Sequence, residues 1–80
     1  MQIKVRYFAQ LRSSSQRFEE DVELANQDSA RSIYYRLAEK YNFPLKFEQL
    51  RVAINDRFVD GDCEPVNGDC LVFIPPVSGG

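Results

Sequence analysis

The residues best placed to do chemistry stand at the end of the sequence, in the run Pro75-Pro76-Val77-Ser78-Gly79-Gly80. Its two prolines favour an extended course and its two glycines carry no Cβ, so the segment has a very small cross-section and could thread a narrow channel. The reactive group there is the α-carboxylate of Gly80, which is ionised at neutral pH. Because a carboxylate is a poor electrophile, another protein must activate it before any group is transferred to it. A passive, frayed chain end is the alternative that these residues leave open.

The rest of the sequence offers few other groups for catalysis or metal binding. It contains no histidine and only two cysteines, Cys63 and Cys70, which cannot assemble an ordinary structural zinc site. We interpret them as reduced thiols rather than a disulfide. Asp60, Asp62 and Asp69 lack the spacing of a calcium-binding loop and are better explained as turn residues. The serines have no evident base, so neither an enzyme constellation nor a metal site is expected.

Length, composition and charge narrow the class of protein. Eighty residues, 44% of them hydrophobic, are enough for one small domain and leave no room for a second. A net charge of -2 gives no general electrostatic reason to bind nucleic acid or an anionic membrane, which makes a protein the favoured partner. No apolar run is long enough for a membrane span and no signal peptide is recognisable, so we expect a cytoplasmic protein.

The first element expected is a half-buried strand over Gln2–Phe8, because its side chains alternate. The side chains of one face are Ile3, Val5 and Tyr7. Phe8 must then share the opposite face with Lys4 and Arg6. Residues 9–16 follow as a connection, in which one helical turn through Gln10-Leu11-Arg12 is expected.

A second strand is predicted over Phe18–Leu24, again from alternation. Its apolar side holds Phe18, Val22 and Leu24, with Glu20 as an interruption. Its other side is acidic and consists of Glu19, Asp21 and Glu23. A charged outer face favours an edge strand that resists further pairing, and a docking site for a basic partner is the alternative.

One amphipathic helix follows, from about Ser29 to Tyr41. Asp28 is the expected N-cap, Asn42 can adopt the left-handed stop, and Pro44 prevents continuation. The helix carries a single apolar stripe, which we interpret as core packing. Its members are Ala30, Ile33, Tyr34, Leu37, Ala38 and Tyr41.

The last third of the chain is predicted to contain short strands joined by turns. Leu50–Asn55 is a strand with Val52 and Ile54 in register, and a turn at Asn55-Asp56 allows Arg57-Phe58-Val59 to pair back. A turn at Asn67-Gly68-Asp69 precedes the final strand. In that strand Leu71 and Phe73 share one face, and Cys70, Val72 and Ile74 share the other.

These elements predict an α+β roll, with one main helix packed on one face of a mixed sheet of four to five strands. We expect a domain over residues 1–74 and a flexible tail over residues 75–80. If the first and last strands are adjacent in the middle of the sheet, Phe8, Val72 and Ile74 gather on the uncovered face beside the root of the tail. Such an apolar patch is typical of a docking surface.

The sequence also resembles the small, sulfur-carrying subunit of molybdopterin synthase, a ubiquitin-like β-grasp protein. The resemblance covers essentially the whole chain and begins with Ile3-Lys4-Val5-Arg6-Tyr7-Phe8-Ala9-Gln10-Leu11-Arg12. Its most specific part runs from Asn67-Gly68-Asp69 through the last strand into Pro-Pro-Val-Ser-Gly-Gly. Gly-Gly alone would be a weak signal.

The resemblance implies a carrier cycle in which no cofactor stays bound to the chain. An activating enzyme similar to ubiquitin E1 would use ATP and magnesium to adenylate Gly80, and sulfur from a persulfide would convert it to a thiocarboxylate. The large synthase subunit, in a heterotetramer of two small and two large subunits, would accept the tail and transfer the sulfur to cyclic pyranopterin monophosphate. Gly79 and Gly80 would then tolerate no side chain, while Phe8, Val72 and Ile74 would dock, with Arg12 as a further polar contact.

Two other classes of function stay open on the sequence. The first is another β-grasp sulfur carrier, for thiamine or transfer-RNA thiolation, or a protein modifier. The second is an interaction module without catalysis, whose tail is passive. The Pro75-Pro76 segment favours the molybdopterin branch.

Overall fold

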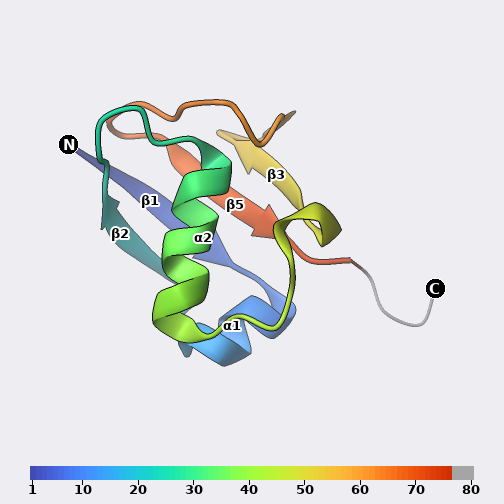
Figure 1. Ribbon diagram of the computed structural model, residues 1–80. Helices are drawn as coiled ribbons and strands as arrows, with labels where there is room; N and C mark the ends of the chain where they lie inside the picture. The colour runs from blue at the N-terminus through green and yellow to red at the C-terminus, as the bar shows by residue number, and fades with distance from the viewer. Residues whose placement is uncertain (77–80) are drawn as a thin grey trace.

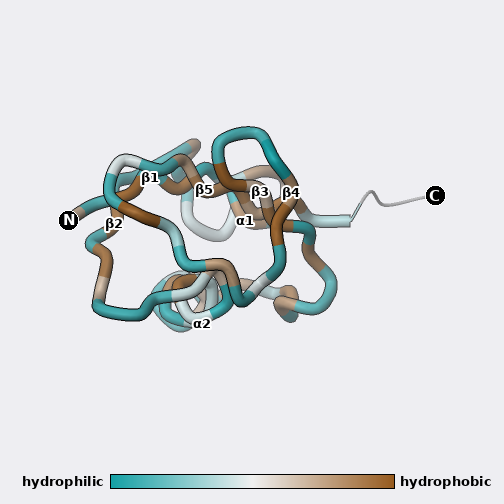
Figure 2. Tube along the Cα trace, turned by 90° about the horizontal axis from the view of Figure 1, so that it is seen from above, coloured by the Kyte–Doolittle hydropathy of each residue, from teal (hydrophilic) through white to brown (hydrophobic). Residues whose placement is uncertain are grey.

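The computed structural model of the chain, which describes residues 1–76, contains a five-stranded mixed sheet with its main helix on one face (Figure 1). The elements in chain order are β1 (Gln2–Tyr7), α1 (Ala9–Ser15), β2 (Glu19–Glu23), α2 (Ala30–Tyr41), the 3-10 helix η1 (Phe47–Gln49), β3 (Arg51–Ile54), β4 (Arg57–Val59) and β5 (Cys70–Ile74). The strands lie in the order β2-β1-β5-β3-β4. Seen from above, α2 forms one layer and the strands form the other (Figure 2). The predicted α+β roll is confirmed.

The first and last strands are adjacent in the middle of the sheet, which is the condition that the sequence analysis set for its apolar patch. β1 and β5 run parallel, with Val5 opposite Leu71 and Tyr7 opposite Phe73. All four side chains are fully buried on the helix side. A parallel pair needs a long crossover connection, and here nearly the whole chain between the two strands provides it. The fold therefore places the end of β1 beside the end of β5, where the tail begins.

Helix α2 starts one residue later than the sequence suggested, and Asp28 is not its N-cap. Ser29 is the cap, because its Oγ accepts a hydrogen bond from the Ser32 N–H at 3.1 Å while the Ser32 Oγ accepts one from the Ser29 N–H at 2.8 Å. The Asp28 carboxylate instead accepts hydrogen bonds from the Ser32 hydroxyl and from Arg36. Two neighbouring residues can each cap a helix, and the reciprocal bonds of a capping box favour the second. The predicted left-handed stop at Asn42 is confirmed by its φ of 57°.

The apolar stripe of α2 packs into an aromatic core, as predicted. The Tyr34 ring lies 5.1 Å from the Phe73 ring, 5.5 Å from Phe43 and 5.7 Å from Phe47, measured between centroids. The Tyr34 hydroxyl donates a 2.7 Å hydrogen bond to the Leu45 carbonyl. Burial raises the pKa of Tyr34 to about 12, so this hydroxyl stays a neutral donor at physiological pH. The stripe therefore holds α2 on the sheet.

Glu20, which interrupts the apolar side of β2, is a hydrogen-bonded residue beside the core whose side chain is only 11% exposed. Its Oε2 atom accepts hydrogen bonds from the Tyr7 and Tyr41 hydroxyls, each at 2.6 Å. Burial and the bond to Glu20 raise the pKa of Tyr7 far above its ordinary value. A buried carboxylate is costly unless it is hydrogen-bonded, and these two hydroxyls supply the bonds. They also tie β2 to β1 and to α2.

The connection after β1 is more helical than predicted. Residues 9–15 form the seven-residue helix α1, whereas the sequence analysis expected one turn through residues 10–12. Leu11 is fully buried, and Gln16 ends the helix in the left-handed conformation. The polar run of serines concealed this helix, because the Ser15 hydroxyl satisfies local backbone groups at the helix end.

Phe18 does not lie on the inner face of β2 with Val22, as its alternation suggested. It precedes the strand, and 69% of its surface is exposed. The guanidinium of Arg12 lies 4.4 Å from the centre of its ring. The Phe18 ring therefore packs against Arg12 outside the core.

The hairpin of β3 and β4 confirms the predicted local pairing. Asn55 and Asp56 have φ angles of 51° and 70°, the positive values that a two-residue type I′ turn requires. The pairing sets Ala53 opposite Phe58. The Asn55 side chain accepts a hydrogen bond from the Cys70 N–H at 2.9 Å, which ties the hairpin to the start of β5.

We predict that Tyr41→Phe lowers the free energy of unfolding by about 1–2 kcal/mol, because it removes one of the two hydroxyls that bond the buried Glu20 carboxylate. Urea unfolding at pH 7 measures the change. Tyr35→Phe is the matched control, since the Tyr35 hydroxyl is exposed and donates only a 3.4 Å bond. Equal effects of both substitutions would contradict a structural role for Glu20.

Asp28 should make folding stability depend on pH. Burial acts to raise the pKa of Asp28, but hydrogen bonds from Arg36, the Ala25 N–H and Ser32 outweigh it and hold the pKa below its ordinary value. A depressed folded-state pKa adds stability that is complete above the unfolded value of about 4 and is lost as pH falls through the folded value.

We therefore expect the stability difference between the wild type and Asp28→Asn to be largest at pH 7 and to shrink as the pH falls below about 4. Urea midpoints measured across that range provide the test. A difference that stays constant with pH would show that the Asp28 charge contributes nothing.

Candidate functional site: the surface at the root of the tail

The last described residues lead the chain out of the sheet. β5 ends at Ile74, as predicted, Pro75 is buried and Pro76 is exposed. The remaining site residues inferred from the sequence, Val77, Ser78, Gly79 and Gly80, lie outside the described residues. The structure therefore describes the base of the predicted tail and the surface around it.

A groove lies directly beside this base. Two sides form it: the end of β1 and α1 on one side, and the end of β5 with the two prolines on the other. The lining residues are Phe8, Ala9, Gln10, Ser13, Ile74, Pro75 and Pro76. Phe8 is 41% exposed. The parallel pairing of β1 and β5 brings Phe8 and Ile74 together here although 65 residues separate them in the sequence.

Arg12 packs against the ring of Phe8. Its guanidinium carbon lies 5.5 Å from the Phe8 ring centre and 4.4 Å from the Phe18 ring centre, so it is shared by the two rings. Its Nε donates a 3.3 Å hydrogen bond to the Tyr7 carbonyl. Arg12 therefore fixes an aromatic surface beside the groove, and its terminal nitrogens are the atoms with which it can meet a partner.

Val72 lies farther from the tail, on the same sheet face as Ile74. It is opposite Arg6 of β1 on one side and opposite Ala53 of β3 on the other. It does not line the groove that holds Phe8 and Ile74. Of the predicted docking residues, the structure therefore brings Phe8 and Ile74 together and sets Val72 one step along the strand.

Phe58 is a neighbour of this surface that the sequence analysis did not single out. It lies opposite Ala53, which in turn lies opposite Val72, and 62% of its surface is exposed. The Arg51 guanidinium stacks 4.1 Å from its ring centre. The two-residue turn at Asn55-Asp56 could have revealed this neighbour from the sequence, because the length of the turn fixes the hairpin register and so places Phe58 opposite Ala53.

The groove at the root of the tail is separate from the phenols whose pKa values are most strongly perturbed. The phenols with the most perturbed pKa values, Tyr7 and Tyr34, serve the core, while the groove is lined by apolar and neutral polar side chains. Within residues 1–76, no group of three or more His, Cys, Asp or Glu could hold a metal ion, and no helix is long and apolar enough to cross a membrane.

Comparison with known proteins identifies the family. The model of the ThiS family matches residues 5–80. The chain belongs to the ThiS family. It is thereby a ubiquitin-like β-grasp protein of the sulfur-carrier type, and the match extends over the strands, the helices and the segment beyond Pro76.

Solved structures agree with this placement in the ThiS family. A putative molybdopterin converting factor, subunit 1, from Pyrococcus furiosus is 27% identical, with a TM-score of 0.80, over 95% of this chain and 98% of that one. SAMP1 from Haloferax volcanii shares the fold at 19% identity and a TM-score of 0.80, over all of both chains. The complex of subunits 1 and 2 of molybdopterin-converting factor from Helicobacter pylori 26695 contains a chain with the same fold, at 23% identity and a TM-score of 0.68 over all of both chains.

Proposed function

We propose that this ThiS-family protein is the sulfur-carrier subunit of a molybdopterin synthase and that the carboxyl group of Gly80 carries the sulfur. The observation that carries the proposal is the continuation of β5 into Pro-Pro-Val-Ser-Gly-Gly beside an apolar groove. The similarity to the molybdopterin converting factor subunit of Pyrococcus furiosus supports the choice of pathway.

The chemistry begins with activation of the carboxylate. An E1-like enzyme, using ATP and magnesium, would let the Gly80 carboxylate attack the α-phosphate, so that pyrophosphate leaves and an acyl adenylate forms. A persulfide sulfur would then attack the acyl carbon, and AMP would leave. Cleavage of the resulting acyl disulfide by a thiol would leave a thiocarboxylate on Gly80. The body of the domain takes no chemical part in these steps.

The second half of the cycle depends on docking. The groove that holds Phe8 and Ile74 would seat the large subunit, with Val72 and Arg12 at its margin, while the tail enters the active site of that subunit. There the sulfur would pass to cyclic pyranopterin monophosphate. Each carrier holds one sulfur and a dithiolene needs two, so two carriers would be consumed for each product. The proposed assembly is a heterotetramer of two small and two large subunits.

A neighbouring function shares the same chemistry. The structural likeness to SAMP1 shows a common fold, and the same activated glycine could instead serve protein modification or another thiolation pathway. The partner separates these functions. Co-purification with a large synthase subunit supports the molybdopterin role, whereas tail conjugates to lysines of other proteins would support a modifier.

The carrier role predicts that deletion of Gly80 abolishes sulfur transfer in a reconstituted synthase assay. Folding should be unchanged, because the deleted residue follows the described core, and circular dichroism with thermal unfolding checks this. One alanine added after Gly80 is a sharper companion variant, since it keeps every native residue but moves the carboxylate. Full activity of either variant would rule out a thiocarboxylate on Gly80.

The same role predicts a mass change in the protein isolated from cells. A fraction of the molecules should end at Gly80 and be heavier by the difference between one sulfur and one oxygen atom. Intact-mass spectrometry measures this, and alkylation of the thiocarboxylate should shift only that fraction. Mature molecules that all continue past residue 80 would contradict the proposal.

The docking role predicts that Phe8→Asp and Ile74→Asp each weaken binding to the large subunit by about tenfold or more, because a charge must then be desolvated in an apolar contact. Phe8 is exposed, so the free energy of unfolding of Phe8→Asp should change by no more than about 1 kcal/mol. Ile74 is half-buried, so Ile74→Asp should lose more stability but stay folded. Val66→Asp is the control, since Val66 is 64% exposed and lies away from the groove. Severe unfolding of the first two variants would show that these side chains support the core.

A further inference from the structure

The edge of the sheet at β2 is open to a further strand. The Leu24 N–H donates to the Met1 carbonyl and the Tyr7 N–H donates to the Phe18 carbonyl, which sets the alternation of the whole antiparallel ladder. The even-numbered residues of β2 therefore bond to β1. The N–H and C=O groups of Glu19, Asp21 and Glu23 point the other way, toward the open edge.

One of these edge groups already has a partner. The Glu23 carbonyl accepts a 2.9 Å hydrogen bond from Arg36 of α2. Among the described residues, no recorded hydrogen bond joins the backbone N–H or C=O of Asp21 to a group outside the ladder. The middle of the edge thus offers one donor and one acceptor in the geometry that an added strand uses.

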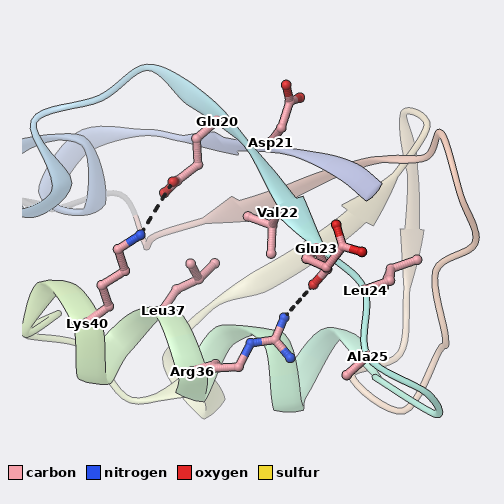
Figure 3. A pocket seen from close by; sticks show the side chains of 9 residues that line it. All are labelled: Glu20, Asp21, Val22, Glu23, Leu24, Ala25, Arg36, Leu37 and Lys40. Carbon is pink, nitrogen blue, oxygen red and sulfur yellow. Dashed lines mark hydrogen bonds and ion pairs between the residues drawn. The ribbon is translucent and has the colours of Figure 1, made fainter. Parts of the chain in front are cut away.

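A groove runs between this edge and α2 (Figure 3). Val22 and Leu37 lie between the two elements in Figure 3, Leu24 and Ala25 lie at one end, and Lys40 lies at the other. Its volume is about 380 Å³. Side chains of an added strand that face the helix would enter this groove beside Val22 and Leu24, where apolar side chains fit best.

The basic residues of the groove are already paired, so they do not call for an acidic occupant. Arg36 lies 2.7 Å from the Asp28 carboxylate, and Lys40 lies 4.0 Å from Glu20 (Figure 3 draws the second contact). The helix side of the groove therefore selects for apolar character rather than for charge.

The outer side of the edge does select for charge. Glu19, Asp21 and Glu23 all present carboxylates there, because their side chains alternate with those in the groove. Glu19 is held by Lys4 at 3.1 Å and by Arg6 at 3.2 Å, while the cation nearest to Asp21 is Lys4, at 3.9 Å. Glu23 is paired with the N-terminal amino group of Met1 at 3.1 Å, so Asp21 is the least neutralised of the three. Residues directly opposite in an antiparallel pair attract when their charges are opposite, so a basic residue is favoured across from Asp21.

The same carboxylates disfavour a second copy of this chain. Two β2 strands joined edge to edge would place acidic side chains opposite one another, which is destabilising. The occupant must therefore differ from β2 in charge.

We propose that the β2 edge and the β2–α2 groove bind an extended segment of another protein, in which apolar residues alternate with lysine or arginine. The segment would pair with the Asp21 N–H and C=O as a sixth strand, place its apolar side chains beside Val22 and Leu24, and set its basic side chains opposite Asp21 and Glu23. The site goes beyond the proposed carrier function. It lies two strands away from β5, so a partner can occupy it while the tail stays free.

The test uses the full chain and a synthetic, fluorescein-labelled peptide that contains Val-Lys-Val-Lys-Val between glycines. Main-chain bonds and a small groove give weak binding, with an expected Kd on the order of 0.1–1 mM. A peptide with glutamate in place of both lysines, and a scrambled peptide with the three valines adjacent, are the matched controls. Both should bind at least about tenfold more weakly, because they lose the charge match or the alternation.

Amide hydrogen exchange reports whether the peptide adds as a strand. Saturating peptide should slow exchange at the Asp21 and Glu23 amides, while the Val22 amide, already bonded to β1, should change little. Protection at Val72 or Phe58 instead, without an effect at Asp21, would overturn the proposal and place the peptide on the docking surface.

Variants at Asp21 separate the backbone contribution from the charge. Asp21→Pro removes the outward N–H and Asp21→Ala keeps it, so the proline variant should bind about tenfold more weakly than the alanine variant.

Asp21→Lys should reverse the preference between the lysine and glutamate peptides, whereas Glu48→Lys, with the same change in net charge on η1, should not. The Asp21→Lys result stands even if the proline variant fails to fold. Equal binding of both peptides by Asp21→Lys, or no binding of the lysine peptide to the wild type at 1 mM or above, would refute the site.

Discussion

The parallel pairing of β1 with β5 is the constraint on which the rest of this structure depends. It commits β1 and β5 to the middle of the sheet, where Val5, Tyr7, Leu71 and Phe73 are fully buried. Because parallel neighbours cannot be joined by a tight turn, the intervening chain must cross over, and α2 covers the helix side of both strands on the way. The same pairing aligns the ends of the two strands. The pairing of β1 with β5 therefore also holds together the residues of the groove beside the tail.

Polar groups inside the fold reinforce this arrangement. The Glu20 carboxylate joins β1, β2 and α2 through two tyrosine hydroxyls, and Asp28 joins the start of α2 to the preceding turn and to Arg36. Glu20 interrupts the apolar side of β2, and Asp28 lies just before the N-cap of α2. Hydrogen bonds to a charged, partly buried group are strong, so both carboxylates act as specific links between elements.

The sequence predicted the sheet, the main helix and the end of the last strand at Ile74, because alternation and helical periodicity follow directly from which face is buried. It underestimated α1, where serines hide a helix that is anchored by Leu11 and ended by Gln16. It misplaced Phe18, because the alternation of side chains was extended one residue beyond the start of β2, where the strand geometry no longer applies. Phe58 escaped notice because its importance depends on Ala53 of β3 and Val72 of β5, and the sequence does not show that these two strands are neighbours. The candidate site was predictable where it rests on the two central strands, and less so where it depends on turns.

The direction of the two central strands also determines how the domain responds to force. If the chain were pulled from its two ends, the starting end of β1 and the finishing end of β5 would be drawn apart along the strand axis. Parallel neighbours then slide lengthwise, and all the hydrogen bonds between them are loaded at once rather than opened one after another. A carrier whose tail is drawn into a partner's channel would for this reason resist being unravelled through it, and the partner would receive the end of the chain while the body stays folded outside.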